Sequence, residues 1–123
     1  MNLSAVRVFV KDVAEAKAFY AERLGLRLTL GDLDNGVCIF DAGSAQLIVE
    51  AVPDGAPADE QVLVGRFTGI SFAVDDIAAR HQDLLASGVE FSGAPEQQYW
   101  GGWLATLKDP AGNELQLVQT AAR

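Results

Sequence analysis

Cysteine and histidine are almost missing from this chain, which holds one of each among 123 residues, Cys38 and His81. A single cysteine excludes a disulfide framework within the chain and any zinc site built on several thiolates. We therefore interpret Cys38 as a small hydrophobic residue of the core.

The chain also has no long apolar run and few basic residues. No stretch approaches the roughly 20 apolar residues of a membrane-spanning helix, and residues 1–10 show neither a secretory signal nor a transit peptide. The chain has nine lysines and arginines and seventeen aspartates and glutamates, which gives a net charge of -8. This charge argues against a nucleic-acid or membrane partner. We expect a cytoplasmic protein whose acidic excess either keeps it soluble or forms a cleft for a cationic ligand.

The two halves of the chain repeat one pattern. The segment AVRVFVKD (residues 5–12) corresponds to GISFAVDD (69–76), and each is followed by a helical stretch that ends near a glycine. Later, DAGS (41–44) and DPAGN (109–113) each precede a closing apolar strand. Each half is therefore predicted to contain one strand, one helix and about three more strands.

This repeat predicts an α+β fold built from two βαβββ modules. We place the modules at residues 2–51 and 67–120 of a single domain, 1–123. The segment 52–66 contains prolines, a glycine and several acidic residues, and we interpret it as an exposed linker.

Capping residues and glycines mark both helices. Asp12 precedes the first helix and Glu15 follows three residues later, a capping-box pattern, while Gly25 ends that helix. Asp76 and Gly88 do the same in the second half. Apolar residues recur at helical spacing in both, so each helix is expected to lie on a sheet.

Strand alternation predicts a second, more polar sheet face. Val6, Val8 and Val10 should pack under the first helix, which leaves the residues between them on the opposite, open face. An open face that mixes charged, amide and apolar side chains is typical of a ligand cavity wall. The candidate ligand-binding residues of this face are Arg7, Phe9, Glu50, Ser71, Glu114 and Gln116.

An aromatic segment completes the candidate site. Tyr99, Trp100 and Trp103 surround two glycines and could stack on a planar ligand or hold a cation, or the tryptophans could pack in the core or a dimer interface. Arg7 needs a partner if it is buried, and Glu50, Glu114 or an acidic group of the ligand could supply it.

The chain resembles the vicinal oxygen chelate superfamily, which contains glyoxalase I, extradiol dioxygenases, fosfomycin-resistance enzymes and bleomycin-resistance binding proteins. The resemblance covers nearly the whole chain and implies two modules that form a curved mixed sheet around a cavity, commonly in a homodimer. The resemblance rests on the motifs Val10-Lys11-Asp12, Phe19-Tyr20, Leu24-Gly25, Val74-Asp75-Asp76, Trp100-Gly101-Gly102 and Asp109-Pro110-Ala111-Gly112-Asn113.

Metal-dependent members of that superfamily hold a divalent cation with about four ligands from the two halves. The matching positions here are Ala5, Ile48, Gly69 and Gln116. Only Gln116 has a donor atom, and one amide cannot compete with water for a divalent cation. We therefore predict no metal and no cofactor, with His81 packed on the helix-bearing side; a relocated site using Glu50 and Glu114 is the alternative.

The function predicted from these residues is that of a metal-free protein that sequesters or carries an organic, in particular aromatic, small molecule. The alternative is a divergent glyoxalase-type or dioxygenase-type enzyme, a lyase, isomerase or oxidoreductase of unknown substrate. In that case Glu50 or Glu114 would act as a general base, and Arg7 would stabilise an anion. A structural or protein-interaction module is a third hypothesis, which explains the polar open face less well.

Overall fold

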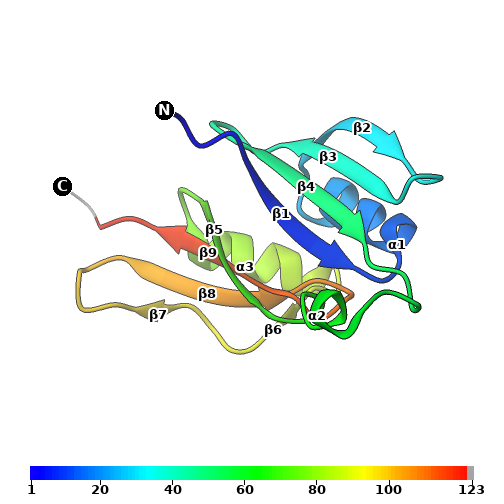
Figure 1. Ribbon diagram of the computed structural model, residues 1–123. Coiled ribbons are helices and arrows are strands. Elements are labelled where there is room, and N and C mark those ends of the chain that lie inside the picture. The colour runs from blue at the N-terminus through cyan, green and yellow to red at the C-terminus, as the bar shows by residue number, and fades with distance from the viewer. Residues whose placement is uncertain (122–123) are drawn as a thin grey trace. The chain divides into compact units, whose positions relative to one another are not determined.

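The computed structural model describes residues 1–121 and divides into two compact units (Figure 1). Unit 1 contains residues 1–66 and 110–113, and unit 2 contains residues 67–109 and the described residues from 114 onward. Each unit has the order strand, helix and further strands, in a mixed sheet, so the predicted α+β class and the βαβββ order are confirmed. Within residues 1–121 no helix is long and apolar enough to span a membrane.

Unit 1 is a four-stranded sheet with the order β1-β4-β3-β2. Strand β1 runs parallel to β4, and the other neighbours are antiparallel. Its elements are β1 (Ala5–Val10), α1 (Val13–Ala18), η1 (Phe19–Arg23), β2 (Arg27–Asp32), β3 (Val37–Asp41), β4 (Gln46–Ala51) and α2 (Ala58–Gln61).

The first helix begins as predicted but ends differently. The carboxylate of Asp12 accepts a hydrogen bond from the Glu15 N–H at 3.1 Å. The regular α-helix then ends at Ala18 and continues as the π-helical turn η1, whereas the sequence predicted one helix up to Gly25. The wider turn contains Tyr20, which is fully buried and whose ring lies against that of Phe40 with centroids 5.9 Å apart.

The core of unit 1 follows the predicted alternation. Val8, Val10, Leu47 and Val49 are each at most 1% exposed, which confirms the row under the helix at Val8 and Val10, whereas Val6 is only partly buried. Cys38 lies opposite Val49 in the neighbouring strand and is also fully buried. Burial raises the pKa of its thiol, as predicted for a core residue rather than a nucleophile.

Unit 2 repeats this arrangement with one additional short strand. The order is β5-β9-β8-β6, with β7 paired to β8 and with β5 parallel to β9. The Asp76 carboxylate caps α3 by accepting from the Ala79 N–H at 3.1 Å. The elements are β5 (Phe67–Ala73), α3 (Ile77–Ala86), β6 (Glu90–Phe91), β7 (Glu96–Gln97), β8 (Trp103–Lys108) and β9 (Glu114–Gln119).

The core of unit 2 contains the closing strand and the face of α3 that packs on the sheet. Leu115 and Leu117 are buried, like Leu47 and Val49 at the equivalent positions of unit 1. His81 is 6% exposed and packs edge-on against Phe91 with ring centroids 4.6 Å apart. The packing role predicted for this histidine is therefore confirmed.

The turn before β9 belongs to unit 1 rather than to unit 2. Asn113 is fully buried; its Oδ1 accepts from Gly65 N at 2.8 Å and its Nδ2 donates to Phe9 O at 2.8 Å. The predicted linker 52–66 is not uniformly exposed, because it begins with buried Val52 and contains α2. The single domain and its module limits stay a prediction.

Candidate functional site

Three predicted residues meet on the open face of unit 1. Arg7 and Phe9 project from β1, and Glu50 lies opposite Phe9 in β4. The guanidinium of Arg7 donates two hydrogen bonds to the Glu50 carboxylate, at 2.9 and 2.6 Å, and its Cζ lies 5.1 Å from the centre of the Phe9 ring. The bidentate pair fixes the guanidinium plane over the aromatic ring.

This pairing identifies the partner of Arg7. Of the partners considered from the sequence, the structure assigns Glu50, and these hydrogen bonds raise the pKa of Arg7. The Arg7 side chain is 56% exposed and that of Glu50 29% exposed, so the pair faces solvent while its charges are balanced. An acidic ligand group is therefore not needed to neutralise Arg7.

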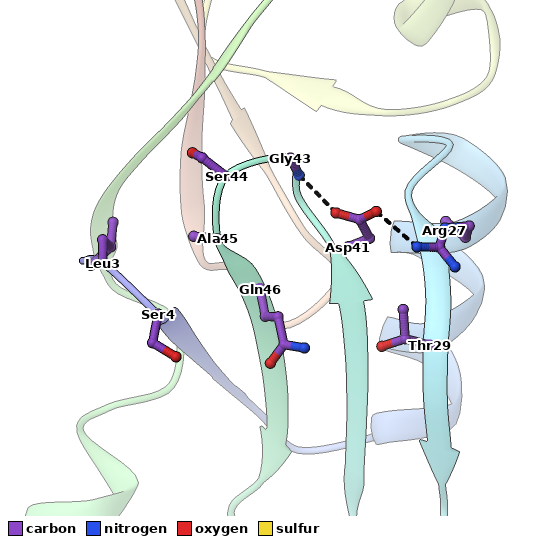
Figure 2. A pocket seen from close by; sticks show the side chains of 9 residues that line it. All are labelled: Leu3, Ser4, Arg27, Thr29, Asp41, Gly43, Ser44, Ala45 and Gln46. Atoms are coloured by element: carbon purple, nitrogen blue, oxygen red, sulfur yellow. Dashed lines mark hydrogen bonds and ion pairs between the residues drawn. The ribbon is translucent and has the colours of Figure 1, made fainter. Parts of the chain in front are cut away.

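A pocket of about 230 Å³ lies at one end of the same sheet and was missed by the sequence analysis. Figure 2 shows Asp41 between Arg27 and the turn that follows β3. The Asp41 carboxylate accepts from Arg27 Nη2 at 2.9 Å and from Gly43 N at 3.0 Å, and both bonds lower the pKa of Asp41. The opposite charges of Arg27 and Asp41, on adjacent strands, were the available signal.

A wider depression of about 680 Å³ lies where β1 and β4 end and the β2–β3 hairpin turns. Two polar groups on its rim are already engaged. Lys11 contacts Gln61 and Asp54, and Asp12 caps α1. These contacts maintain the fold, and we assign no ligand to this depression.

The open face of unit 2 brings Gln116 together with neutral polar groups. Gln116 lies between Ser71 on β5 and Thr106 on β8 in the strand register. Its Nε2 donates to Thr106 Oγ1 at 3.2 Å. Gln116 and Thr106 line a pocket of about 220 Å³ with Glu96 and Leu104. Glu114, the first residue of β9, lies two residues before Gln116 and opposite Lys108.

A bulge interrupts β5 before Ser71. From the pair Phe67–Glu114 to the pair Ser71–Gln116, β5 advances four residues and β9 only two. The Thr68 hydroxyl donates to Glu114 O at 2.8 Å, and its oxygen accepts from Ile70 N at 3.1 Å, which closes the bulge. Gly69 has φ +75° there, a conformation that strains any other residue.

The three aromatic side chains of the segment 99–103 do not form one surface. Tyr99 is fully exposed, and Trp100 is 43% exposed with its ring packed on Gly102, where a Cβ would overlap the indole. Trp103 lies opposite Gln119, whose side chain accepts from Ile77 N at the start of α3. Trp103 therefore lies on the helix-bearing face of its sheet, and the structure does not bring it together with Gln116.

Comparison with models of known protein families identifies the family of this chain. A model of the Glyoxalase/Bleomycin resistance protein/Dioxygenase superfamily matches residues 2–117. The chain belongs to this superfamily. The resemblance inferred from the sequence motifs is thereby confirmed.

Three similar proteins represent the superfamily. A bleomycin resistance protein from Klebsiella pneumoniae is 30% identical over 116 residues, which cover 89% of this chain and 85% of that protein. TnmS3, an antibiotic-binding protein from Streptomyces sp. CB03234, has a TM-score of 0.77 at 26% identity and covers 98% of this chain and 97% of its own. A superfamily member from Sphaerobacter thermophilus has a TM-score of 0.79 at 24% identity, with 97% of both chains covered, and supports the fold alone.

The positions that carry metal ligands in the superfamily do not fit a cation here. Ala5 and Ile48 in unit 1 have no donor atom, and Gly69 occupies the bulge of β5. Gln116 has one amide, which is bonded to Thr106. Within residues 1–121 there is no group of three or more histidine, cysteine, aspartate or glutamate side chains that could hold a metal ion.

Proposed function

We propose that this superfamily member is a metal-free binding protein for a small organic molecule. The observation that carries the proposal is the side-chain chemistry at the four superfamily ligand positions. Three of them have no donor atom, and the fourth, Gln116, is a neutral amide hydrogen-bonded to a hydroxyl. A divalent cation needs several converging oxygen or imidazole donors, which these side chains do not supply.

Each open face, taken by itself, supplies contacts of the kind that an organic ligand uses. Unit 1 offers the guanidinium of Arg7 over Phe9, with Glu50, and unit 2 offers Ser71 and Gln116. Such a mixture of apolar walls and a few oriented polar groups is typical of ligand sites. Glu114, Tyr99 and Trp100 complete the proposed set on unit 2, and Trp103 belongs to it only if the ligand reaches the helix-bearing face.

The charges of the chain favour a neutral or cationic ligand. The sequence left a conflict, because a net charge of -8 attracts cations whereas a lone Arg7 attracts anions. The bidentate bond to Glu50 removes the second preference. The names of two relatives, a bleomycin resistance protein and an antibiotic-binding protein, support a ligand of antibiotic type.

The enzyme alternative has weaker support from the geometry. Glu50 or Glu114 would have to act as a general base. Both carboxylate oxygens of Glu50 already accept hydrogen bonds from Arg7, so proton abstraction by Glu50 would compete with that pair, and Glu114 lies opposite Lys108 in the strand register. A metal-free binding protein in a homodimer, in the cytoplasm, is the form of the proposal that we carry forward.

Calorimetric titration with bleomycin and a panel of aromatic antibiotics, with and without a chelator, tests this function. We expect stoichiometric binding that the chelator leaves unchanged. Arg7→Ala should weaken it, whereas Arg66→Ala, which removes an exposed arginine of unit 1 outside the proposed site, should not. Binding or turnover that requires an added divalent metal would support the enzyme instead, and failure of every compound to bind would reject the proposal.

A further inference from the structure

The pocket on the open face of unit 2 contains a donor and an acceptor side by side. Gln116 Nε2 donates to Thr106 Oγ1 at 3.2 Å, which uses one lone pair of the hydroxyl and one hydrogen of the amide. Within residues 1–121, Gln116 Oε1 and the hydroxyl hydrogen of Thr106 have no other hydrogen bond. A ligand in the pocket thus meets an acceptor, Gln116 Oε1, and two donors, the Thr106 hydroxyl and the second hydrogen of Gln116 Nε2.

We propose that this Gln116–Thr106 pocket recognises an uncharged group that both donates and accepts hydrogen bonds, such as a primary carboxamide. Its N–H would donate to Gln116 Oε1, and its carbonyl oxygen would accept from the Thr106 hydroxyl. The inference rests on the proposed binding function and deepens it. It assigns to Gln116, at a superfamily metal-ligand position, the recognition of a neutral group in place of a cation.

The hydrogen-bonding groups of the pocket, rather than its charge, favour a neutral group over an ionised one. The charged side chain that lines the pocket is Glu96 on β7, which is exposed to solvent. Because this carboxylate is exposed and screened by salt, it acts only weakly on a ligand charge of either sign. The hydrogen-bonding groups make the selection: a carboxylate has no hydrogen to donate to Gln116 Oε1, and an ammonium group has no atom that can accept from the Thr106 hydroxyl.

The size of the pocket limits what enters it. About 220 Å³ exceeds the roughly 150 Å³ of an apolar cavity that holds benzene, but is smaller than the roughly 300–1,000 Å³ of pockets that enclose a drug-sized molecule. One ring or one side arm of a larger ligand therefore fits. Leu104 supplies an apolar wall, so benzamide combines the expected ring and head group in a single probe.

Titration of the full chain with three matched probes tests the proposal by ¹H–¹⁵N NMR. We expect benzamide to shift the backbone amides of Gln116 and Thr106 and the side-chain amide of Gln116. Benzoate and benzylamine have the same ring with a negative and a positive head group. Each should bind about tenfold more weakly, the effect expected when one polar pair is left unmatched.

Two variants and one control assign the recognition to these side chains. Gln116→Glu keeps an acceptor of the same size but loses the amide hydrogen that donates to Thr106, so the Thr106 hydroxyl is expected to donate to the new carboxylate and no longer to the ligand. Thr106→Val removes the hydroxyl at nearly constant volume. Each should weaken benzamide binding about tenfold. Gln82→Glu makes the same charge change as Gln116→Glu on an exposed position of α3, outside the pocket, and should leave the affinity unchanged. Dispersed spectra of all three variants confirm that they fold.

Several results would overturn the inference. Tighter binding of benzoate or benzylamine than of benzamide would do so, and so would unchanged benzamide affinity in Gln116→Glu. If titration with Mn²⁺ selectively broadens the Gln116 signals, the position binds a metal ion and the inference is wrong. If benzamide fails while bleomycin or another panel compound still binds, the pocket assignment is wrong but the binding function stands; if all fail, both are rejected.

Discussion

The two sheets carry similar residues on their buried faces and different residues on their open faces. Leu47 and Val49 in β4 match Leu115 and Leu117 in β9, and all four are buried. The open face of unit 1 instead carries ion pairs, Arg7–Glu50 and Arg27–Asp41, whereas unit 2 places the neutral pair Gln116–Thr106 there. The buried rows are constrained because a register slip of one residue would expose them all, whereas the open rows are free to change with the ligand.

The turns before the closing strands differ in the same sense. In unit 1 the turn after β3 is held by Asp41, which is accessible and bonded to Arg27 and Gly43. The corresponding turn before β9 provides Asn113, a fully buried residue that bonds to Gly65 and Phe9. One turn of the repeat therefore forms part of a surface pocket, and the other stabilises the interior of unit 1.

Substitutions in the shared core should have the largest effect and should be equal in both sheets. Leu47→Ala and Leu115→Ala each remove a fully buried side chain, so each should lower the free energy of unfolding by about 2–5 kcal/mol. Urea denaturation followed by circular dichroism measures both. Leu85→Ala, on an exposed position of α3, is the control, and a loss in one sheet only would contradict the equivalence of the two cores.

The two turns should respond unequally to truncation. Asn113→Ala leaves the N–H of Gly65 and the carbonyl of Phe9 without their partner, which should cost about 2–3 kcal/mol of unfolding free energy. Ser44→Ala, at an exposed position in the other turn, should change it little. Urea denaturation measures the unfolding free energy of both variants. An equal decrease in both would show that Asn113 contributes no more to stability than the surface turn.

The two polar pairs should differ in their dependence on salt. Double-mutant cycles on Arg7 with Glu50 and on Gln116 with Thr106 measure the coupling of each pair in urea unfolding. We expect the first coupling to be small and to fall when salt is raised from about 0.1 to about 1 M, where the screening length decreases to about 3 Å. The second should stay constant, because neither partner is charged. If both coupling energies depend equally on salt, the open faces of the two units do not differ in charge character as we infer.

The smallest expected effect is the pH dependence due to Asp41. Hydrogen bonds from Arg27 and Gly43 lower its folded-state pKa, so its contribution is present above the unfolded-state pKa of about 3.9 and is lost as pH falls through the lower folded value. The difference in urea midpoint between the wild type and Asp41→Asn should therefore be larger at neutral pH than in acid. Asp34→Asn, in the exposed β2–β3 hairpin, is the matched control. A difference that grows in acid would contradict the sign.

Much of the fold was predictable because its causes are local. Period-two alternation placed Val8 and Val10 inside, and caps at Asp12 and Asp76 marked where the helices begin. The four superfamily ligand positions could also be read directly from the sequence. The ion pair of Arg7 was predictable as a need for a partner, but not as a choice between Glu50 and Glu114.

Other features of the candidate site required the tertiary structure. The π-helical turn after Ala18 and the partnership of Gln116 with Thr106 have no signal of their own in the sequence. Gly69 within a predicted strand was a signal for the bulge, but it did not show which residues would pair on either side. Trp103 was grouped with Tyr99 by proximity in sequence, but its strand position directs it to the face that carries α3.

The sequence by itself determined which rows of side chains are buried, where helices start, and that three of four superfamily ligand positions have no donor. The tertiary structure alone decided which polar groups meet across strands, since that depends on register and bulges rather than on spacing along the chain. Side-chain periodicity is a property of each strand, whereas hydrogen-bond partners are a property of the pairing between strands.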